Sequence, residues 1–286
     1  MSKLDHFTSA FKSAAKDVYT HTRVDVEKVL VVTDLDAEQT ERFAKDVKEF
    51  LGVINDRAVA AWAHHFAQPN EDVAALLTHI EHERPDLICC YRNLHGRARK
   101  YPFSLGAHVD VLTQATTTPV LLLPFPTDEG RLSSQCQHTD SVMVLTDHLT
   151  GCDTLIDWGV RVTSDGGKLV LAHLEDDTIF ERYLDVIGKI PEIDTDVARK
   201  RIFDQLLKEP ADYIGSVVSA LEGKVAGLRV ERDVRMGHRV DDCKKLLAEH
   251  GTQLLVMNTK DDEQLAMHGL AYPLAVELRD VPLLML

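Results

Sequence analysis

The segment Ser141–Asp147 (SVMVLTD) and the segment Lys28–Asp34 (KVLVVTD) share one sequence pattern. Each is a short apolar run that ends in Thr-Asp, and each is followed by a stretch with helical periodicity. An apolar run without polar alternation is typical of a strand buried on both faces of a parallel sheet. The two segments therefore predict the first strands of two similar α/β units.

Later segments of the chain correspond in the same order, which indicates a repeat. The further strands expected in the two copies are Pro85–Cys90 (PDLICC), Pro119–Leu123 (PVLLL), Gly251–Met257 (GTQLLVM) and Pro282–Leu286 (PLLML). In each copy a glycine, Gly106 or Gly269, stands thirteen residues before the last of these strands. Strands that alternate with helices predict parallel sheets covered on both faces, so the expected fold class is α/β with two tandem doubly wound domains.

The pattern divides the chain into a helix, two domains and a linker. The expected segments are an amphipathic helix in 1–25, a first domain over 26–125, a polar linker over 126–139, and a second domain over 140–286 with a helical insertion at 174–224. The first domain is shortened, because about 24 residues separate Asp34 from the strand expected at Val59–Ala63. That length accommodates one helix but not a helix, a strand and a second helix.

Two helical segments lie outside this repeat. Leu4, Phe7, Phe11 and Val18 form an apolar stripe at helical spacing, which we expect to cover the strip of sheet left open by the shortened domain. The insertion reads as an extended crossover helix broken by Pro210, with a partner-binding flap as the alternative.

The composition narrows the class of protein. The 286 residues carry a net charge of −14, which disfavours binding to nucleic acid or to an anionic membrane. The sequence contains neither a membrane-length apolar run nor the apolar core of a signal peptide, so the expected location is the cytoplasm. The five cysteines include no Cys-x-x-Cys pair and are interpreted as reduced thiols, Cys152 among them.

Taken together, the strand order, the strand expected to end at His173 and the segment Gly237–Met257 resemble the universal stress protein family, which has tandem members. The resemblance covers roughly residues 26–125 and 139–286. It implies the flavodoxin-like, adenine-nucleotide α-hydrolase type of sheet, with a ligand crevice at the carboxyl ends of the strands. It also implies that the two domains associate through their last strands.

The nucleotide-binding members of that family have a loop of the form G-x2-G-x9-G-(S/T), whose backbone N–H groups approach phosphate. The equivalent positions in the first repeat are Asn93, Gly96, Gly106 and Ala107. Two glycines and their spacing are kept, while the first glycine and the hydroxyl are lost. The resemblance further places Asp34 near the nucleoside, with a helix-capping aspartate as the alternative.

The second repeat keeps less of this loop. Its equivalent positions are Val256, Thr259, Gly269 and Leu270. Acidic residues fill the loop, so we expect a degenerate site in which Asp147 and Gly269 bind no nucleotide.

The strongest cationic cluster lies beside the first of these loops. It comprises Arg92, His95, Arg97, Arg99 and Lys100. The cluster predicts an anion site, and a solvated loop is the alternative. His79 and His82 on one helix, and His64 and His65 after a strand, lack the further ligands of a metal site, so no metal is expected.

Motifs of hydrolases, P-loop proteins and dinucleotide-binding enzymes are absent from the sequence. The expectation is therefore a regulatory or signalling protein without catalysis that acts through an unidentified protein partner. The alternative is a regulator that binds ATP or AMP in the first repeat and hydrolyses it slowly. The sequence leaves a homodimer open.

Overall fold

The computed structural model describes most of the chain after residue 18. The described residues are 19–57, 60–66, 72–94, 103–146, 153–225, 227–237, 239–259, 267 and 271–286. The helix expected in 1–25 therefore lies mainly outside the described residues.

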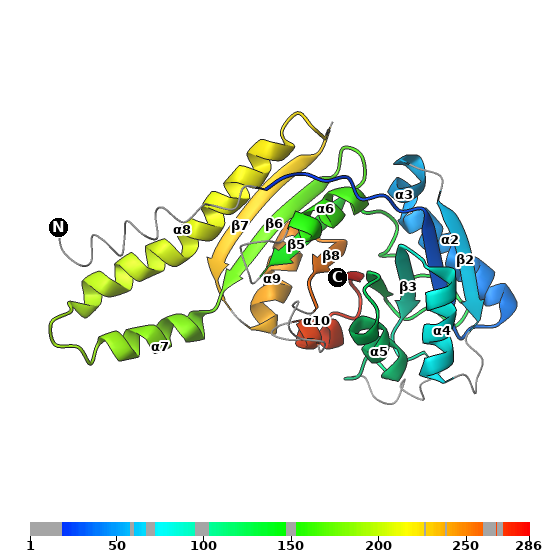
Figure 1. Cartoon of the computed structure of the whole chain (residues 1–286), viewed down its shortest axis with the longest axis horizontal. Coiled ribbons are helices and arrows are strands. Elements are labelled where there is room, and N and C mark those ends of the chain that lie inside the picture. The colour runs from blue at the N-terminus through cyan, green and yellow to red at the C-terminus, as the bar shows by residue number, and fades with distance from the viewer. Residues whose placement is uncertain are drawn as a thin grey trace.

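Nine strands of the described chain form one sheet (Figure 1). They are β1 (Lys28–Thr33), β2 (Ala61–Phe66), β3 (Leu87–Tyr91), β4 (Val120–Leu123), β5 (Ser141–Thr146), β6 (Lys168–Glu175), β7 (Arg229–Met236), β8 (Leu254–Met257) and β9 (Leu283–Met285). Their order is β2-β1-β3-β4-β9-β8-β5-β6-β7. The sheet is thus continuous across the linker expected at 126–139.

The two halves of the sheet meet at its centre. All strand pairs within the half β2-β1-β3-β4 and within the half β9-β8-β5-β6-β7 are parallel, whereas β4 and β9 pair antiparallel. Leu121 lies opposite Leu284 in this central pair. The resemblance implies such a contact between the last strands of the two repeats.

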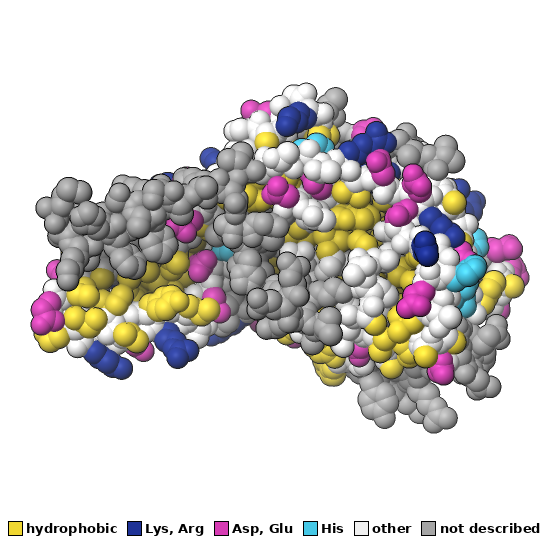
Figure 2. All heavy atoms as spheres, viewed as in Figure 1, with side chains coloured by type: hydrophobic (Ala, Val, Ile, Leu, Met, Phe, Trp, Pro, Cys, Tyr) yellow, Lys and Arg dark blue, Asp and Glu magenta, His cyan; other side chains and the backbone are white. Residues whose placement is uncertain are grey.

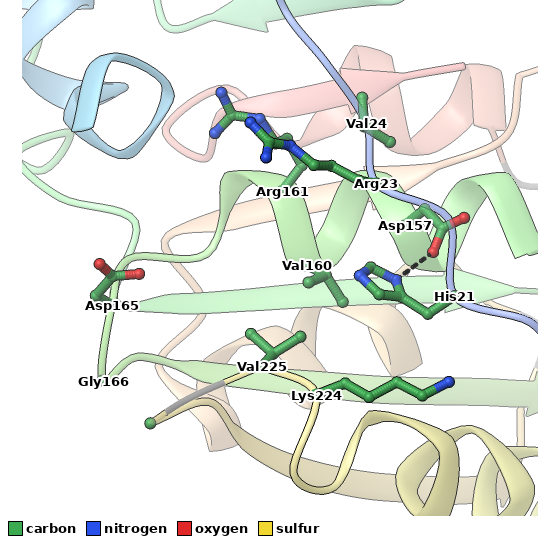
Figure 3. Close-up of a pocket in the computed structure, with 11 residues that line it drawn as sticks. His21, Arg23, Val24, Asp157, Val160, Arg161, Asp165, Gly166, Lys224 and Val225 are labelled. Atoms are coloured by element: carbon green, nitrogen blue, oxygen red, sulfur yellow. Dashed lines mark hydrogen bonds and ion pairs between the residues drawn. The ribbon is translucent and has the colours of Figure 1, made fainter. Parts of the chain in front are cut away.

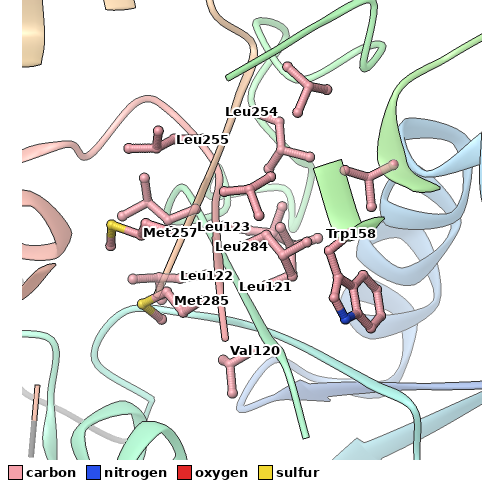
Figure 4. Close-up of a cluster of buried hydrophobic side chains, with 14 of the residues drawn as sticks. Val120, Leu121, Leu122, Leu123, Trp158, Leu254, Leu255, Met257, Leu284 and Met285 are labelled. Atoms are coloured by element: carbon pink, nitrogen blue, oxygen red, sulfur yellow. The ribbon is translucent and has the colours of Figure 1, made fainter. Parts of the chain in front are cut away.

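The central strands are apolar and buried along their length. Leu122 and Leu283 are fully buried, and Leu284 is 1% exposed. Figure 4 shows side chains of β4, β8 and β9 gathered with Trp158 in one cluster. Since a buried leucine contributes about 1.5–3 kcal/mol, this junction joins the halves through the hydrophobic core rather than through surface contacts.

Helices flank the sheet (Figure 1). They are α2 (Ala37–Phe50), α3 (Gly52–Arg57), α4 (Val73–Glu83), α5 (Ala107–Ala115), α6 (Asp153–Val162), α7 (Asp177–Ile187), α8 (Thr195–Leu221), α9 (Val240–His250) and α10 (Ala271–Glu277). Several begin at an aspartate whose carboxylate accepts backbone N–H groups; Asp36, Asp176 and Asp194 do so for α2, α7 and α8. These caps satisfy donors that a helix leaves open at its start.

The shortened first half differs from the sequence prediction in the position of the missing unit. β2 pairs directly with β1, as β6 pairs with β5 in the second half. In the second half, α7, α8 and the edge strand β7 follow β6, whereas among the described residues α4 follows β2. The missing helix and strand therefore belong after β2, not before it, because β2 occupies the second position of its half and the edge position is empty.

The stretch between the halves is packed against α2 rather than extended as a free linker. Gln39 and Arg42 of α2 donate hydrogen bonds to the carbonyls of Asp128 and Glu129, at 3.1 Å each. Arg131 pairs with Asp46 at 2.8 Å. Leu132 and Cys136 are buried, so this stretch contributes to the hydrophobic core.

The insertion forms a helical arm, made of α7 and α8, that projects from the body (Figure 1). α8 continues through Pro210, so the break expected there is wrong. Proline removes one backbone hydrogen bond from a helix. Beyond Pro210, however, Ile214, Val217 and Leu221 are buried, and α8 packs on β6 and β7; we attribute the continuity of the helix to this packing.

Candidate functional site

A hydrogen bond between two side chains links the carboxyl ends of two neighbouring strands of the first half, β1 and β3. Asp34 directly follows β1, and Tyr91 is the last residue of the neighbouring β3. The Tyr91 hydroxyl donates to the Asp34 carboxylate, and the Asp34 backbone N–H donates to the same hydroxyl at 3.0 Å. The carboxylate that the resemblance places near a nucleoside is thus already engaged by a neighbouring strand.

The ring of Tyr91 is held in this position by two aromatic neighbours. Phe43 and Phe125 contact it edge-on, each with a ring-centroid distance of 5.4 Å. Burial raises the pKa of Tyr91 well above its ordinary value, and the hydrogen bond to Asp34 raises it further. The hydroxyl therefore stays protonated and continues to donate to Asp34 at neutral pH.

Two of the predicted loop residues, Asn93 and Gly106, contact each other. Gly106 has φ +88°, and a Cβ on it would lie 2.8 Å from the Asn93 Cα. Its N–H donates to the Ser104 hydroxyl at 3.1 Å, and the Asn93 N–H donates to the Leu105 carbonyl at 2.7 Å. A glycine is thus required here by backbone conformation and by close packing, without reference to a ligand. Ala107 begins α5 directly after it.

Arg92 does not belong to an anion site, which corrects the sequence interpretation. Its side chain is buried and donates to the carbonyls of Ala275, Val276 and Leu278 at the end of α10, in the second half. Burial lowers the pKa of Arg92 to about 10, with a further contribution from the nearby Arg279 cation. The guanidinium therefore caps the carboxyl end of a helix across the junction.

Several predicted site residues lie outside the described part of the chain. They are Gly96, Arg97 and Arg99 of the first loop, its neighbours His95 and Lys100, and Asp147, Cys152 and Gly269 of the second repeat. Their roles stay predictions.

Two of the four histidines singled out in the sequence form a ring pair. His65 of β2 and His79 of α4 stack with their ring centroids 4.2 Å apart. Within the described segments, no three His, Cys, Asp or Glu side chains are gathered as a metal site. In the second half, His173 is buried, and its Nε2 lies 3.0 Å from a Glu175 carboxylate oxygen.

A cleft of about 710 Å³ lies at the opposite, amino-terminal edge of the second half (Figure 3). The extended chain at residues 19–27 forms one wall, and α6 lies beneath it; Lys224 and Val225, after α8, form the other wall. The described chain therefore begins against the second half and crosses to the first half at β1.

Asp157 of α6 anchors this crossing segment. Its buried carboxylate accepts from the Tyr19 hydroxyl at 2.6 Å, lies 2.8 Å from the His21 Nδ1, and accepts the Thr22 N–H at 3.2 Å. This cluster was not predicted from the sequence. One signal was available, because Asp157 is a lone carboxylate inside the apolar run 155–160 (LIDWGV).

Arg161, one turn further along α6, also lines this cleft. Its guanidinium is buried and donates to the carbonyls of Val53 and Ile54 in α3, at 3.0 Å each. Arg92 and Arg161 thus cross the junction in opposite directions, each to backbone carbonyls of a helix in the other half.

The arrangement of the sheet and its flanking helices is found in solved structures. A universal stress protein from Archaeoglobus fulgidus DSM 4304 aligns with 92% of this chain and 98% of its own, with a TM-score of 0.52 and 14% identity. The chain has the universal stress protein fold. Its likeness to this structure extends across both halves of the sheet, as the coverage shows.

Two further solved structures are similar to this chain, one over most of its length and one over about half of it. A putative universal stress protein from Pseudomonas aeruginosa UCBPP-PA14 covers 91% of this chain and 93% of its own, with a TM-score of 0.49 and 12% identity. A universal stress protein family member from Burkholderia pseudomallei covers 54% of this chain and 98% of its own, with a TM-score of 0.37 and 17% identity. No family model and no curated protein matches the sequence.

No described helix has both the length and the apolar character needed to cross a membrane.

Proposed function

We propose that this chain is a non-enzymatic regulatory protein of the universal stress type, which acts in the cytoplasm through a protein partner. The observation that carries the proposal is the Tyr91–Asp34 bond, because it engages the acidic side chain at the first-half crevice. The packing of Gly106 on Asn93 supports it. Both features use family positions for contacts within the chain, which supports a function that does not depend on a bound nucleotide.

The alternative is a regulator that binds ATP or AMP in the first half, with slow hydrolysis. The kept spacing between Gly96 and Gly106 favours this alternative. Phosphate contacts would then come from backbone N–H groups and from Arg97 or Arg99, whose guanidinium groups suit phosphate oxygens.

Isothermal titration calorimetry with ATP, ADP and AMP distinguishes the two. We expect no binding to the full chain at millimolar nucleotide. The matched control is Tyr91→Phe, which keeps the ring between its aromatic neighbours and releases the Asp34 carboxylate from the hydroxyl. Mass spectrometry of small molecules released from natively purified protein provides a second, independent readout.

Binding to the unmodified chain would contradict the proposal if it is weakened in Arg97→Ala/Arg99→Ala. Binding that appears only in Tyr91→Phe would support it, because this would show that the hydroxyl excludes the ligand. Phosphate release by the unmodified chain that disappears in Asp34→Asn would establish catalysis and overturn the non-enzymatic assignment.

A further inference from the structure

The helical arm carries an open apolar surface, here called the arm face. It comprises Ile179, Tyr183 and Val186 of α7, Ile190 and Ile193 of the connection, and Val197 of α8. These side chains are between 40% and 56% exposed. Figure 2 shows hydrophobic side chains gathered along the arm. A contiguous apolar patch of this kind marks a docking surface.

The arm face is distinct from the inner contact of the arm. Phe180 and Leu184 of α7 are buried, and the Phe180 ring lies 5.8 Å from that of Phe203 in α8. Ile179, Tyr183 and Val186 recur at helical spacing on a different stripe of α7. The arm therefore already has an interior, and the arm face is an additional apolar side of it.

The described chain begins close to the base of this arm. Tyr19 is 3% exposed and is bonded to Asp157. The Thr20 N–H donates to one oxygen of Asp153 at 3.2 Å, while the Tyr213 hydroxyl of α8 donates to the other at 3.1 Å. One carboxylate thus joins the start of the described chain to α8.

The sequence before Tyr19 has the length and the apolar pattern of a helix that could cover the arm face. Leu4, Phe7, Phe11 and Val18 lie on one helical stripe, and residues 4–18 as a helix would be about 21 Å long. The stretch of α8 from Tyr213 back to Val197 is about 24 Å long.

We propose that residues 1–18 dock as an amphipathic helix along the arm and cover the arm face. This replaces the first-half sheet as the target of the stripe, because the chain at Tyr19 is tied to α6 and, through Asp153, to α8 of the second half. The inference does not depend on whether the first half binds nucleotide. According to this proposal, the arm face binds an amphipathic helix. In the free protein this helix is the N-terminal segment of the same chain.

Photo-crosslinking of the full chain tests the docking. p-Benzoylphenylalanine is introduced at Phe11, on the stripe, and in a matched control at Ser9, on the opposite side of the same helix. We expect irradiation of the Phe11 variant to give a product within one chain, mapped by peptide mass spectrometry to residues 179–203. The Ser9 variant should give about tenfold less of it, because its side chain points away from the arm.

A crosslink between two chains would overturn the proposal in favour of a second copy on the arm face. A crosslink to β2 or α4 would restore the first-half sheet as the target, and the absence of any crosslink from position 11 would exclude docking.

Hydrogen exchange provides a second readout that does not depend on the crosslinker. Phe7→Asp/Phe11→Asp should make the α7 amides exchange about tenfold faster, because two apolar contacts with the arm are lost. Lys3→Asp is the control with a similar change of charge off the stripe. Equal α7 exchange in all three proteins would contradict the proposal.

Discussion

The two halves of the sheet differ in which features of the repeated unit they retain, the binding loop or the full set of strands. The first half keeps Gly106 and its spacing from Gly96, but its described residues include no edge strand equivalent to β7 and no helix leading to one. The second half has the full set of strands and the arm, while Val256 and Thr259 stand at two of the glycine positions. Completeness of the fold and retention of the binding loop are therefore independent in this chain. Gly106 shows why, since backbone packing requires the glycine without a ligand.

The largest expected effect comes from the junction that joins the halves. Leu284→Ala should lower the free energy of unfolding by about 2–5 kcal/mol, because Leu284 is buried in the central strand pair and the substitution leaves a cavity. Trp62 and Trp158 report on the first and the second half, so fluorescence of Trp62→Phe and Trp158→Phe backgrounds follows each half in urea. We expect the two probes to shift together.

Phe103→Ala is the matched control, since that side chain is 74% exposed and should change stability little. Two separate transitions in the unmodified backgrounds would show that the halves unfold independently despite the shared sheet.

The next prediction concerns Arg92 and Arg161, which each join one half of the sheet to a helix of the other half. Arg92→Met and Arg161→Met should each lower the free energy of unfolding by about 2–3 kcal/mol, since each leaves buried helix carbonyls without their charged donor. Equilibrium urea unfolding measures the loss. Arg→Lys at each position separates charge from geometry, because lysine cannot donate to two carbonyls in the same fork. Unchanged stability in both Met variants would mean that burying the cation costs as much as its bonds contribute.

We expect a smaller and more local loss of stability when the segment at residues 19–27 is released from α6. Asp157→Asn should cost about 1–3 kcal/mol, because the buried carboxylate accepts from Tyr19 and from the Thr22 backbone. Limited proteolysis should then cleave within this segment sooner than in the unmodified chain. Asp185→Asn, at an exposed position of α7 away from this segment, is the control. Equal cleavage rates in all three proteins would rule out an anchoring role for Asp157.

The smallest expected effect concerns the edge strand that the first half lacks. Burial raises the pKa of Asp233 in β7, but hydrogen bonds from Arg235 and His250 outweigh it and hold the pKa below its ordinary value. A carboxyl whose pKa is lowered on folding stabilises the protein above its unfolded pKa, and this contribution is lost as the pH falls through the folded pKa. Asp233→Asn should therefore cost about 1 kcal/mol at pH 7 and less below about pH 4.

Thermal unfolding between pH 3 and pH 7 measures this difference, with Asp165→Asn as the exposed control. A loss of equal size at every pH would assign the role of Asp233 to packing instead of charge.

The sequence predicts the strands well. Strands that are buried on both faces of a sheet consist of apolar residues, and such runs are visible in the sequence. β1, β5 and β8 lie where KVLVVT, SVMVLT and the apolar part of GTQLLVM place them. The position of β2 in the sheet could not be predicted in this way, because strand order depends on pairing between distant segments. The missing unit was consequently assigned to the wrong side of β2.

The candidate site was harder to predict because charge in a sequence does not reveal burial. Arg92 stands in a cationic stretch, yet its partners are carbonyls of α10, far along the chain. The engagement of Asp34 by Tyr91 likewise depends on two neighbouring strands that end together. The role of Asp157 requires the chain at Tyr19 to reach the second half, and no local pattern indicates that crossing.

The order in which strands leave the ribosome differs from their order in the sheet. β4 is complete at Leu123, but its central partner β9 begins only at Leu283. At synthesis rates of 5–20 residues per second, the apolar edge of β4 stays unpaired for roughly 10 to 30 s. An unpaired apolar edge is a template for association with other chains, so we expect the growing polypeptide to need a chaperone that covers β4 until β9 is made.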